Sequence, residues 1–255
     1  MPYAEHLLIE TPSDETVIWR YLDLPKFLLM LEQRSLYFAL LSEFEDKWEA
    51  VLDRELTTGI ANQFAAASGQ VIGLYQEYFK HTAVNCWYCG AEESIAMWRL
   101  YTTSEYGVAI KSTVKDLKRA LAGYEKEVYL GAVVYRDHTA PPAQTLSANE
   151  ITPYKAILQK RVCYKHELEL RAITHFLPEF PENSPLGTLV EAPYPEHGRP
   201  VPIDLPTLIQ SVTTGPNFPG WAWKLLESAL SRADLKVLVI ESNAFKPPDT
   251  RYFKP

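Results

Sequence analysis

The sequence predicts an α+β fold, in which several helices accompany a mixed, mainly antiparallel sheet. Along 255 residues, short stretches of alternating apolar residues are separated by stretches whose apolar residues recur three and four positions apart. Apolar residues make up 47% and charged residues 22% of the chain, which excludes a disordered or collagen-like protein. Neither G-x-G-x-x-G nor G-x-x-x-x-G-K-[ST] occurs, so P-loop and Rossmann folds are unsupported. We expect a single domain over residues 1–255.

The first half of the chain opens with a strand, a helix and a second strand. Trp19 and Tyr21 alternate with their neighbours in the first strand, and Asp23 is the expected N-cap of the helix. Thr113, with Asp116 three residues later, predicts another capped helix. In order, we expect strands at 17–22, 35–40, 82–87 and 106–112, and helices at 24–31, 56–80, 92–100 and 114–121.

The second half contains the clearest strand pattern, at 167–176, where apolar and polar residues alternate strictly. Ten of the nineteen prolines fall within 177–220, which predicts a long structured loop of the kind that often flanks a site. We expect strands at 128–135, 167–176, near Val201 and at 237–240, helices at 154–162, 205–212 and 221–231, and irregular structure at 139–149 and 246–255.

The charge and the hydropathy pattern restrict the classes of partner. The formal charge is −7 and the pI is about 5.5, which disfavours binding of duplex DNA through a basic face. No stretch has the roughly 18 to 20 consecutive apolar residues of a membrane helix, and the first thirty residues lack a signal-peptide pattern. We therefore expect a cytoplasmic protein without a membrane partner. Three cysteines in a chain of this length indicate reduced thiols.

The first candidate site is the segment from Glu167 to Arg171. Period-2 alternation places Glu167, Glu169 and Arg171 on one face of the predicted strand. In a cleft, these carboxylates can stabilise developing positive charge or orient a ribose hydroxyl, and Arg171 can keep one of them ionised. The alternative is a solvated strand face with cross-strand ion pairs.

Further candidates lie on other predicted elements. Arg20 and Tyr21 are on the first strand, where the guanidinium is either an edge-strand charge or a fork for phosphate. Ser112 ends a strand and is either a pocket residue or an extension of the cap at Thr113. Carboxylates at 45, 46 and 49 are interpreted as a solvated helix start.

Aromatic and sulfur-containing side chains offer two other readings. Trp98 and Tyr101 lie one helical turn apart and either stack on a nicotinamide or base, or belong to the core. Four residues resemble metal ligands, and the alternatives are a tetrahedral zinc site, a redox C-x-x-C pair, and buried or incidental thiols, which we favour; no metal is expected. The four residues are Cys86, Cys89, Cys163 and His166.

Several short segments follow one another in a definite order and spacing across residues 17 to about 176. They are Trp19-Arg20-Tyr21, residues 27–31, residues 35–38, residues 44–49, Cys86-Trp87, residues 97–101, residues 107–110, Lys160-Arg161 and residues 166–171, with a weaker echo at residues 201–204. By this order and spacing, the chain resembles an uncharacterised bacterial domain family found in phage-defence settings.

A second resemblance bears on activity. An arginine on the first strand, Ser-Thr at the end of a middle strand and Glu-x-Glu on a later strand are similar to the Arg-Ser-Glu class of ADP-ribosyltransferases. The resemblance implies that Arg20 binds the phosphate or ribose of NAD, that Ser112 steadies the pocket, and that Glu169 holds the 2′-hydroxyl of the nicotinamide ribose. It also implies that Glu167 orients the acceptor.

The leading hypothesis is therefore an NAD-dependent ADP-ribosyltransferase or NAD glycohydrolase that acts as a toxin or defence effector. Its substrate would be NAD, and its macromolecular acceptor is unknown. Glu169 and Glu167 are its catalytic candidates. Its NAD-binding candidates are Arg20, Tyr21, Ser112, Trp98, Tyr101 and Arg171. One alternative is a metal-dependent nuclease in which Asp46, Glu167 and Glu169 hold Mg²⁺ and Lys165 or Lys160 assists. The other is a non-catalytic binding or sensing module of a defence system.

Overall fold

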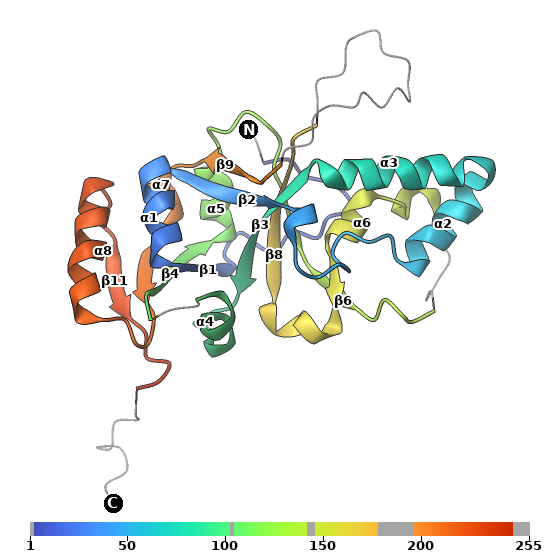
Figure 1. Ribbon diagram of the computed structural model, residues 1–255. Helices are drawn as coiled ribbons and strands as arrows, with labels where there is room; N and C mark the ends of the chain where they lie inside the picture. The colour runs from blue at the N-terminus through green and yellow to red at the C-terminus, as the bar shows by residue number, and fades with distance from the viewer. Residues whose placement is uncertain (1–2, 103–104, 142–145, 178–195, 247–255) are drawn as a thin grey trace, which may run out of the picture. The chain divides into compact units, whose positions relative to one another are not determined.

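The computed structural model describes residues 3–102, 105–141, 146–177 and 196–246 (Figure 1). The protein is α+β with a mainly antiparallel sheet, which confirms the predicted fold class. Contacts along the chain group it into two compact units. The first unit consists of Met1–Pro12, Leu36–Cys86 and Ala122–Val201, and the second of Ser13–Ser35, Trp87–Leu121 and Pro202–Pro255. The single domain expected over 1–255 stays a prediction.

The first unit contains most of its strands in antiparallel pairs. Ala39 of β2 lies opposite Val84 of β3, and β8 pairs antiparallel with β5 and also pairs with β3. A separate two-stranded sheet joins β6 and β7 in parallel. The elements are β2 (Ser35–Leu40), α2 (Arg54–Phe64), α3 (Ser68–Lys80), β3 (Thr82–Cys89, up to Cys86), β5 (Tyr129–Ala132), β6 (Val134–Arg136), α6 (Pro153–Ile157), β7 (Gln159–Arg161), β8 (Glu169–His175) and β9 (Arg199–Pro202, up to Val201).

The second unit is built on β4, which pairs antiparallel with β1 on one side and β10 on the other. The edge strand β11 runs parallel to β10. Helices α1 and α8 contact each other within this unit (Figure 1). The elements are β1 (Val17–Asp23), α1 (Leu24–Gln33), the end of β3, α4 (Ile95–Tyr101), β4 (Gly107–Thr113), α5 (Val114–Ala120), α7 (Leu205–Leu208), β10 (Ser211–Thr214), α8 (Gly220–Arg232) and β11 (Leu238–Glu241).

Each unit has an apolar core of its own. In the first unit, Leu56 and Ile60 of α2 pack with Val84 of β3 and Ile173 of β8, and all four side chains are buried. Burial of one such side chain stabilises the folded state by roughly 1.5 to 3 kcal/mol. In the second unit, a smaller cluster is rich in aromatic rings, and its members are Trp19, Tyr21, Met97, Trp98 and Ala109.

The prediction of one continuous helix over 56–80 is wrong, because the structure has two helices there. Ala65 has a φ of 35°, a left-handed value that ends α2, and a 3-10 turn over Ala65–Ala67 leads into α3. Apolar periodicity persists through the break because both helices place apolar residues against the same core. Alanine is a strong helix former, so residues 65–67 themselves give no stop signal.

Other predicted bounds also change. The helix expected at 154–162 ends at Ile157, because Gln159–Arg161 pairs with β6 as β7. The strand expected at 167–176 begins at Glu169, since Leu168 adopts a left-handed φ of 39° after the 3-10 turn Val162–Glu167. The helix expected at 205–212 ends at Leu208, and Ser211–Thr214 becomes β10 between β4 and β11.

The remaining segments bear on the loops and on membrane association. Within the predicted loop at 177–220, residues 178–195 lie outside the described residues, as do residues 142–145 of the turn-rich segment and 247–255 of the tail. Among the helices that the structure describes, none has the length and apolar character that crossing a bilayer requires.

Candidate functional site

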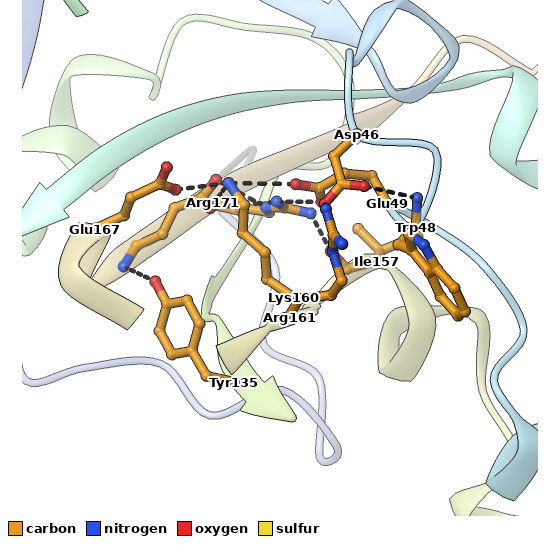
Figure 2. Close-up of polar contacts among 10 residues, drawn as sticks. Asp46, Trp48, Glu49, Tyr135, Ile157, Lys160, Arg161, Glu167 and Arg171 are labelled. Carbon is orange, nitrogen blue, oxygen red and sulfur yellow. Dashed lines mark hydrogen bonds and ion pairs between the residues drawn. The ribbon is translucent and has the colours of Figure 1, made fainter. Parts of the chain in front are cut away.

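The first unit contains a buried cluster of five charged side chains, which we call the charge cluster: Glu49, Lys160, Glu167, Glu169 and Arg171 (Figure 2). Glu169 and Arg171 share a face of β8 because they are two residues apart on a strand. Lys160 comes from β7, and Glu49 from the loop before α2. Three separate segments of the sequence therefore supply the cluster.

The Lys160 ammonium lies among the three carboxylates. Its Nζ is 2.6 Å from Oε2 of Glu167, 3.2 Å from Oε1 of Glu49 and 3.3 Å from Oε2 of Glu169. Nζ also lies 4.7 Å from the centre of the Tyr164 ring, over its face. An ammonium surrounded in this way is held in its charged form and is unsuited to act as a nucleophile.

The Arg171 guanidinium connects the other members. Nε donates to Oε1 of Glu169 at 2.8 Å, and one terminal nitrogen donates to Oε2 of Glu49 at 2.6 Å. The other terminal nitrogen donates to the carbonyl of Ile157 at 2.6 Å. The side chain is fully buried, so these charge-assisted hydrogen bonds compensate for its loss of solvent.

The charges fix one another's ionisation. Burial by itself would raise the pKa of the Glu169 carboxyl, but Arg171 and then Lys160 lower that pKa to about 2. Burial would lower the pKa of Lys160, but Glu169, Glu49 and Glu167 raise it above its usual range. Burial likewise opposes the charge on Arg171, and Glu169 and Glu49 raise its pKa. At neutral pH, Glu169 is a permanent anion.

The charge cluster carries an excess of one negative charge. Its three carboxylates and two cations sum to a formal −3 + 2 = −1. Glu167 and Glu169 are 5% and 6% exposed and Arg171 is 0% exposed. The interpretation of this segment as a solvated strand face is therefore wrong, because Glu167 and every residue of β8 except His175 are buried. A buried anionic excess favours a cationic partner.

Polar and aromatic side chains surround the charge cluster. The Tyr135 hydroxyl accepts the backbone N–H of Glu169 at 2.8 Å, and the Cys86 thiol hydrogen-bonds the Glu169 carboxylate. Next to the cluster, Nε of Arg161 donates to Oδ2 of Asp46 at 3.0 Å (Figure 2). The predicted solvated helix start at 45–49 is wrong for Glu49, which is buried.

The other predicted site residues belong to the second unit, where they lie on two faces of its sheet. Arg20 of β1 pairs with Ile110, and Ser112 of β4 pairs with Ile18, so Arg20 and Ser112 share a face. Tyr21 lies on the opposite face, where its ring meets Trp98 edge-on at 4.9 Å between centres. The structure thus brings together Arg20 with Ser112, and Tyr21 with Trp98.

These predicted site residues differ in burial and in their hydrogen-bond partners. Trp98 is 3% exposed and donates from Nε1 to Glu93 at 2.8 Å, which makes it a core residue as well as a candidate. The Tyr21 hydroxyl accepts the backbone N–H of Ser94 at 2.7 Å. Tyr101 is exposed at the end of α4. Ser112 is fully buried, and its hydroxyl has no hydrogen-bond partner in the described part of the chain.

The cysteines do not assemble with His166 in the structure. Cys86 and Cys89 are partly buried on β3, whereas Cys163 is exposed, and none of the three is in a disulfide. Among residues 3–102, 105–141, 146–177 and 196–246, no three His, Cys, Asp or Glu side chains are grouped as a metal would require. Arg161 donates a hydrogen bond to Asp46, and Arg171 donates one to Glu169, so these carboxylate oxygens already have cationic partners.

Two members of the charge cluster were not among the predicted site residues. Lys160 was given only an assisting role in the nuclease alternative, and Glu49 was interpreted as solvated. The resemblance to the bacterial domain family contained both residues, at 44–49 and Lys160-Arg161, together with 166–171. The fold brings these distant residues together, and their spacing along the sequence does not indicate this.

The comparisons with known proteins add no relative to this description. No family model, curated protein or solved structure matches the chain.

Proposed function

We propose that the protein cleaves the N-glycosidic bond between nicotinamide and ribose in NAD, as an ADP-ribosyltransferase or an NAD glycohydrolase. The observation that carries the proposal is the buried Glu169 carboxylate, whose pKa Arg171 and Lys160 lower to about 2 against the effect of burial. Cleavage of this bond develops oxocarbenium character on the ribose, and a fixed carboxylate in a water-poor site stabilises that charge.

The electrostatics of the charge cluster support this substrate. The nicotinamide ring of NAD is cationic, and the cluster has a formal charge of −1 from its described members. A cation that enters the cluster therefore balances the charge. Lys160 is the most exposed member of the cluster, with 9% of its side chain exposed. In the proposed complex, the 2′-hydroxyl of the ribose takes the place of Lys160 Nζ, which lies 3.3 Å from Oε2 of Glu169.

The proposed reaction assigns one role to each carboxylate. Glu169 accepts a hydrogen bond from the 2′-hydroxyl while the C1′–N bond breaks and nicotinamide leaves with the bonding electron pair. A water or acceptor oxygen forms the new bond to C1′, and its proton passes to Glu167, which orients the acceptor. Arg171 keeps Glu169 in place through Nε at 2.8 Å.

The predicted binding residues of the second unit rest on the resemblance alone and stay predictions. The resemblance gives Arg20 a phosphate or ribose and gives Ser112, on the same face of that unit's sheet, a steadying role. Tyr21, Trp98 and Tyr101 would contact the planar ring of the substrate. The acceptor remains a macromolecule or water, and a cytoplasmic location suits the intracellular supply of NAD.

The nuclease alternative has less support from the geometry. It requires Asp46, Glu167 and Glu169 to share a divalent cation, but Arg161 lies at Asp46, Lys160 at Glu167, and Arg171 at Glu169. A metal would have to displace these three cations.

The test is release of nicotinamide from NAD by the purified full chain. We expect release by the natural sequence and loss of at least a hundredfold in rate for Glu169→Gln, because the stabilising charge is removed. Glu45→Gln is the matched control, since it makes the same change at an exposed residue of the 44–49 segment and should leave the rate unchanged.

The outcomes separate the hypotheses. No release with any protein, nucleic-acid or water acceptor would contradict the proposal. Chelator-sensitive cleavage of nucleic acid would support the nuclease. Activity in cells that survives Glu169→Gln would favour a binding or sensing module. Far-UV circular dichroism of each variant shows whether the fold is retained.

A further inference from the structure

Two arginines lie side by side next to the charge cluster, on the small parallel sheet of the first unit. Arg136 of β6 is the register partner of Arg161 of β7. Paired residues on neighbouring strands are about 4.8 Å apart and point to the same side of the sheet. Their side chains are 35% and 40% exposed, so both guanidinium groups reach solvent.

Each guanidinium is held by a carboxylate from another element. Arg136 pairs with Glu55 of α2, and Arg161 pairs with Asp46 through Nε and a terminal nitrogen at 3.0 Å each. Lys155 of α6 also lies 3.4 Å from Glu55. Three cations and two carboxylates sum to a formal +3 − 2 = +1, so this group carries the opposite sign to the charge cluster.

The arginines keep donors for a ligand. A guanidinium has five N–H donors, and the described residues accept from Arg136 only at one terminal nitrogen, toward Glu55. The carboxylates fix the direction of the groups without using all the donors. Positioned guanidinium pairs of this kind suit the oxygens of adjacent phosphates, which they bind bidentately.

An exposed indole, that of Trp48, contacts residues next to each arginine. Trp48 is 42% exposed, and its backbone N–H donates to Asp46 at 3.1 Å, the carboxylate that holds Arg161 (Figure 2). The Trp48 ring lies 5.8 Å from the ring of His138, two residues after Arg136. Both ring nitrogens of His138 are enclosed and have no hydrogen-bond partner in the described part of the chain. These are polar atoms beside an open aromatic surface.

From these contacts we infer that Arg136 and Arg161 form a subsite for the pyrophosphate of an adenine nucleotide, whose base stacks on Trp48 beside His138. The inference rests on the proposed function, where that nucleotide is the ADP-ribose part of NAD. It assigns the phosphate contact to the first unit, whereas the resemblance assigned a phosphate or ribose contact to Arg20. The pyrophosphate brings negative charge to the group of formal charge +1 while the cationic nicotinamide ribose enters the cluster of charge −1.

The experiment is calorimetric titration of the full chain with ADP, which has the pyrophosphate and the base but no nicotinamide bond to cleave. We expect ADP to bind the natural sequence, and Arg136→Gln and Arg161→Gln each to weaken its affinity about tenfold or more. Arg161→Lys keeps the ion pair with Asp46 but loses the planar fork, so a weakening there with an unchanged melting temperature excludes misfolding as the cause.

Two further variants identify the parts of the subsite. Trp48→Ala should weaken ADP but leave the affinity for inorganic pyrophosphate unchanged, because only ADP has a base to stack. Arg119→Gln is the matched control: Arg119 is 65% exposed, forms a similar surface pair with Asp116 at 3.5 Å, and lies in the second unit. It should leave ADP binding unchanged.

The inference and the proposed function fail separately. Absence of ADP binding at millimolar concentration, or an ADP affinity in the Arg136 and Arg161 variants equal to that of the natural sequence, would overturn the subsite even if NAD is cleaved. Loss of ADP binding in Arg20→Gln alone would overturn it in favour of Arg20. ADP binding that requires Arg136 and Arg161, in a protein that releases no nicotinamide, would support the subsite and contradict the proposed reaction.

Discussion

At the scale of single residues, Lys160 balances the buried charge cluster. Its ammonium lies within 3.3 Å of three carboxylates, and Arg171 helps to neutralise two of them, Glu49 and Glu169. Buried ion groups stabilise a fold little in total, but removal of one partner leaves the others buried and unpaired. The stability of the first unit therefore depends on this one side chain more than on any surface pair.

The substitution Lys160→Met tests this dependence. We expect the free energy of unfolding at pH 7 to fall by about 3 to 5 kcal/mol, because three buried carboxylates then share one guanidinium. Urea denaturation measures the change. Lys80→Met is the control, since Lys80 is half-exposed beside Glu77 and such a pair contributes roughly 0 to 1 kcal/mol. Equal losses in the two variants would contradict the interpretation.

The neighbours Ser112 and Thr113 allow a second comparison. The buried Ser112 hydroxyl has no described partner, whereas the Thr113 hydroxyl accepts the N–H of Asp116 as the N-cap of α5. We expect Ser112→Ala to leave the free energy of unfolding unchanged or to raise it by up to about 1 kcal/mol. Thr113→Ala should lower it by about 1 kcal/mol. Loss of NAD affinity in a stable Ser112→Ala protein would assign Ser112 to the pocket.

At the scale of secondary structure, the sequence predicts an element well where its own apolar pattern and capping residues determine its bounds. The strand at 35–40 has the predicted bounds, and α5 begins after the predicted cap at Thr113. Prediction fails where pairing with distant residues decides. Gln159–Arg161 is polar, yet it forms β7 against β6, and Ser211–Thr214 becomes β10 because β4 and β11 lie on either side.

The same limit applies to the candidate site. Alternation along 167–171 correctly placed Glu169 and Arg171 on one face, but it could not show that this face is buried. Lys160 and Glu49 are distant in sequence, and only the fold brings them to β8. Arg136 and Arg161 become neighbours through a parallel pairing that no local pattern predicts.

The break between α2 and α3 gives a prediction at this scale. Ala65 has a φ of 35°, where a Cβ is unfavourable and glycine is not. We expect Ala65→Gly to raise the free energy of unfolding by about 0.5 to 1 kcal/mol in urea denaturation. Ala67→Gly, at a φ of −95°, should lower it slightly. If Ala65→Gly is the more destabilising of the two, the break is not a site of backbone strain.

At the scale of the whole molecule, the first unit contains a partly buried histidine that makes the unit's stability depend on pH. His175 at the end of β8 contacts the Tyr78 hydroxyl through Nε2 at 2.7 Å and the Thr82 hydroxyl through Nδ1 at 3.0 Å. Tyr154 and Tyr129 also face its ring. Burial lowers the pKa of His175 to about 4, so the ring is neutral at physiological pH.

The sign of the resulting pH dependence follows from proton uptake. Between about pH 4 and 6.5 the unfolded histidine binds a proton and the folded one does not, so stability is lost as the pH falls below 6.5. We expect a loss of about 2 kcal/mol by pH 5 from this residue. Urea denaturation from pH 7.5 to 5 measures it, and His175→Gln should flatten this dependence. The exposed His197, changed to Gln, should not.

Each unit consists of three separate stretches of the chain, and this arrangement determines how the protein is made. The last stretch of the first unit ends at Val201, while the second unit still needs Pro202–Pro255 for β10, α8 and β11. As the ribosome synthesises the chain, the first unit, with the charge cluster, is completed before the second. Because the stretches of the two units alternate, parts of the second unit emerge before the first is complete. A polypeptide released near Val201 would thus contain every residue of the charge cluster without the completed second unit, and no single cut separates the two units.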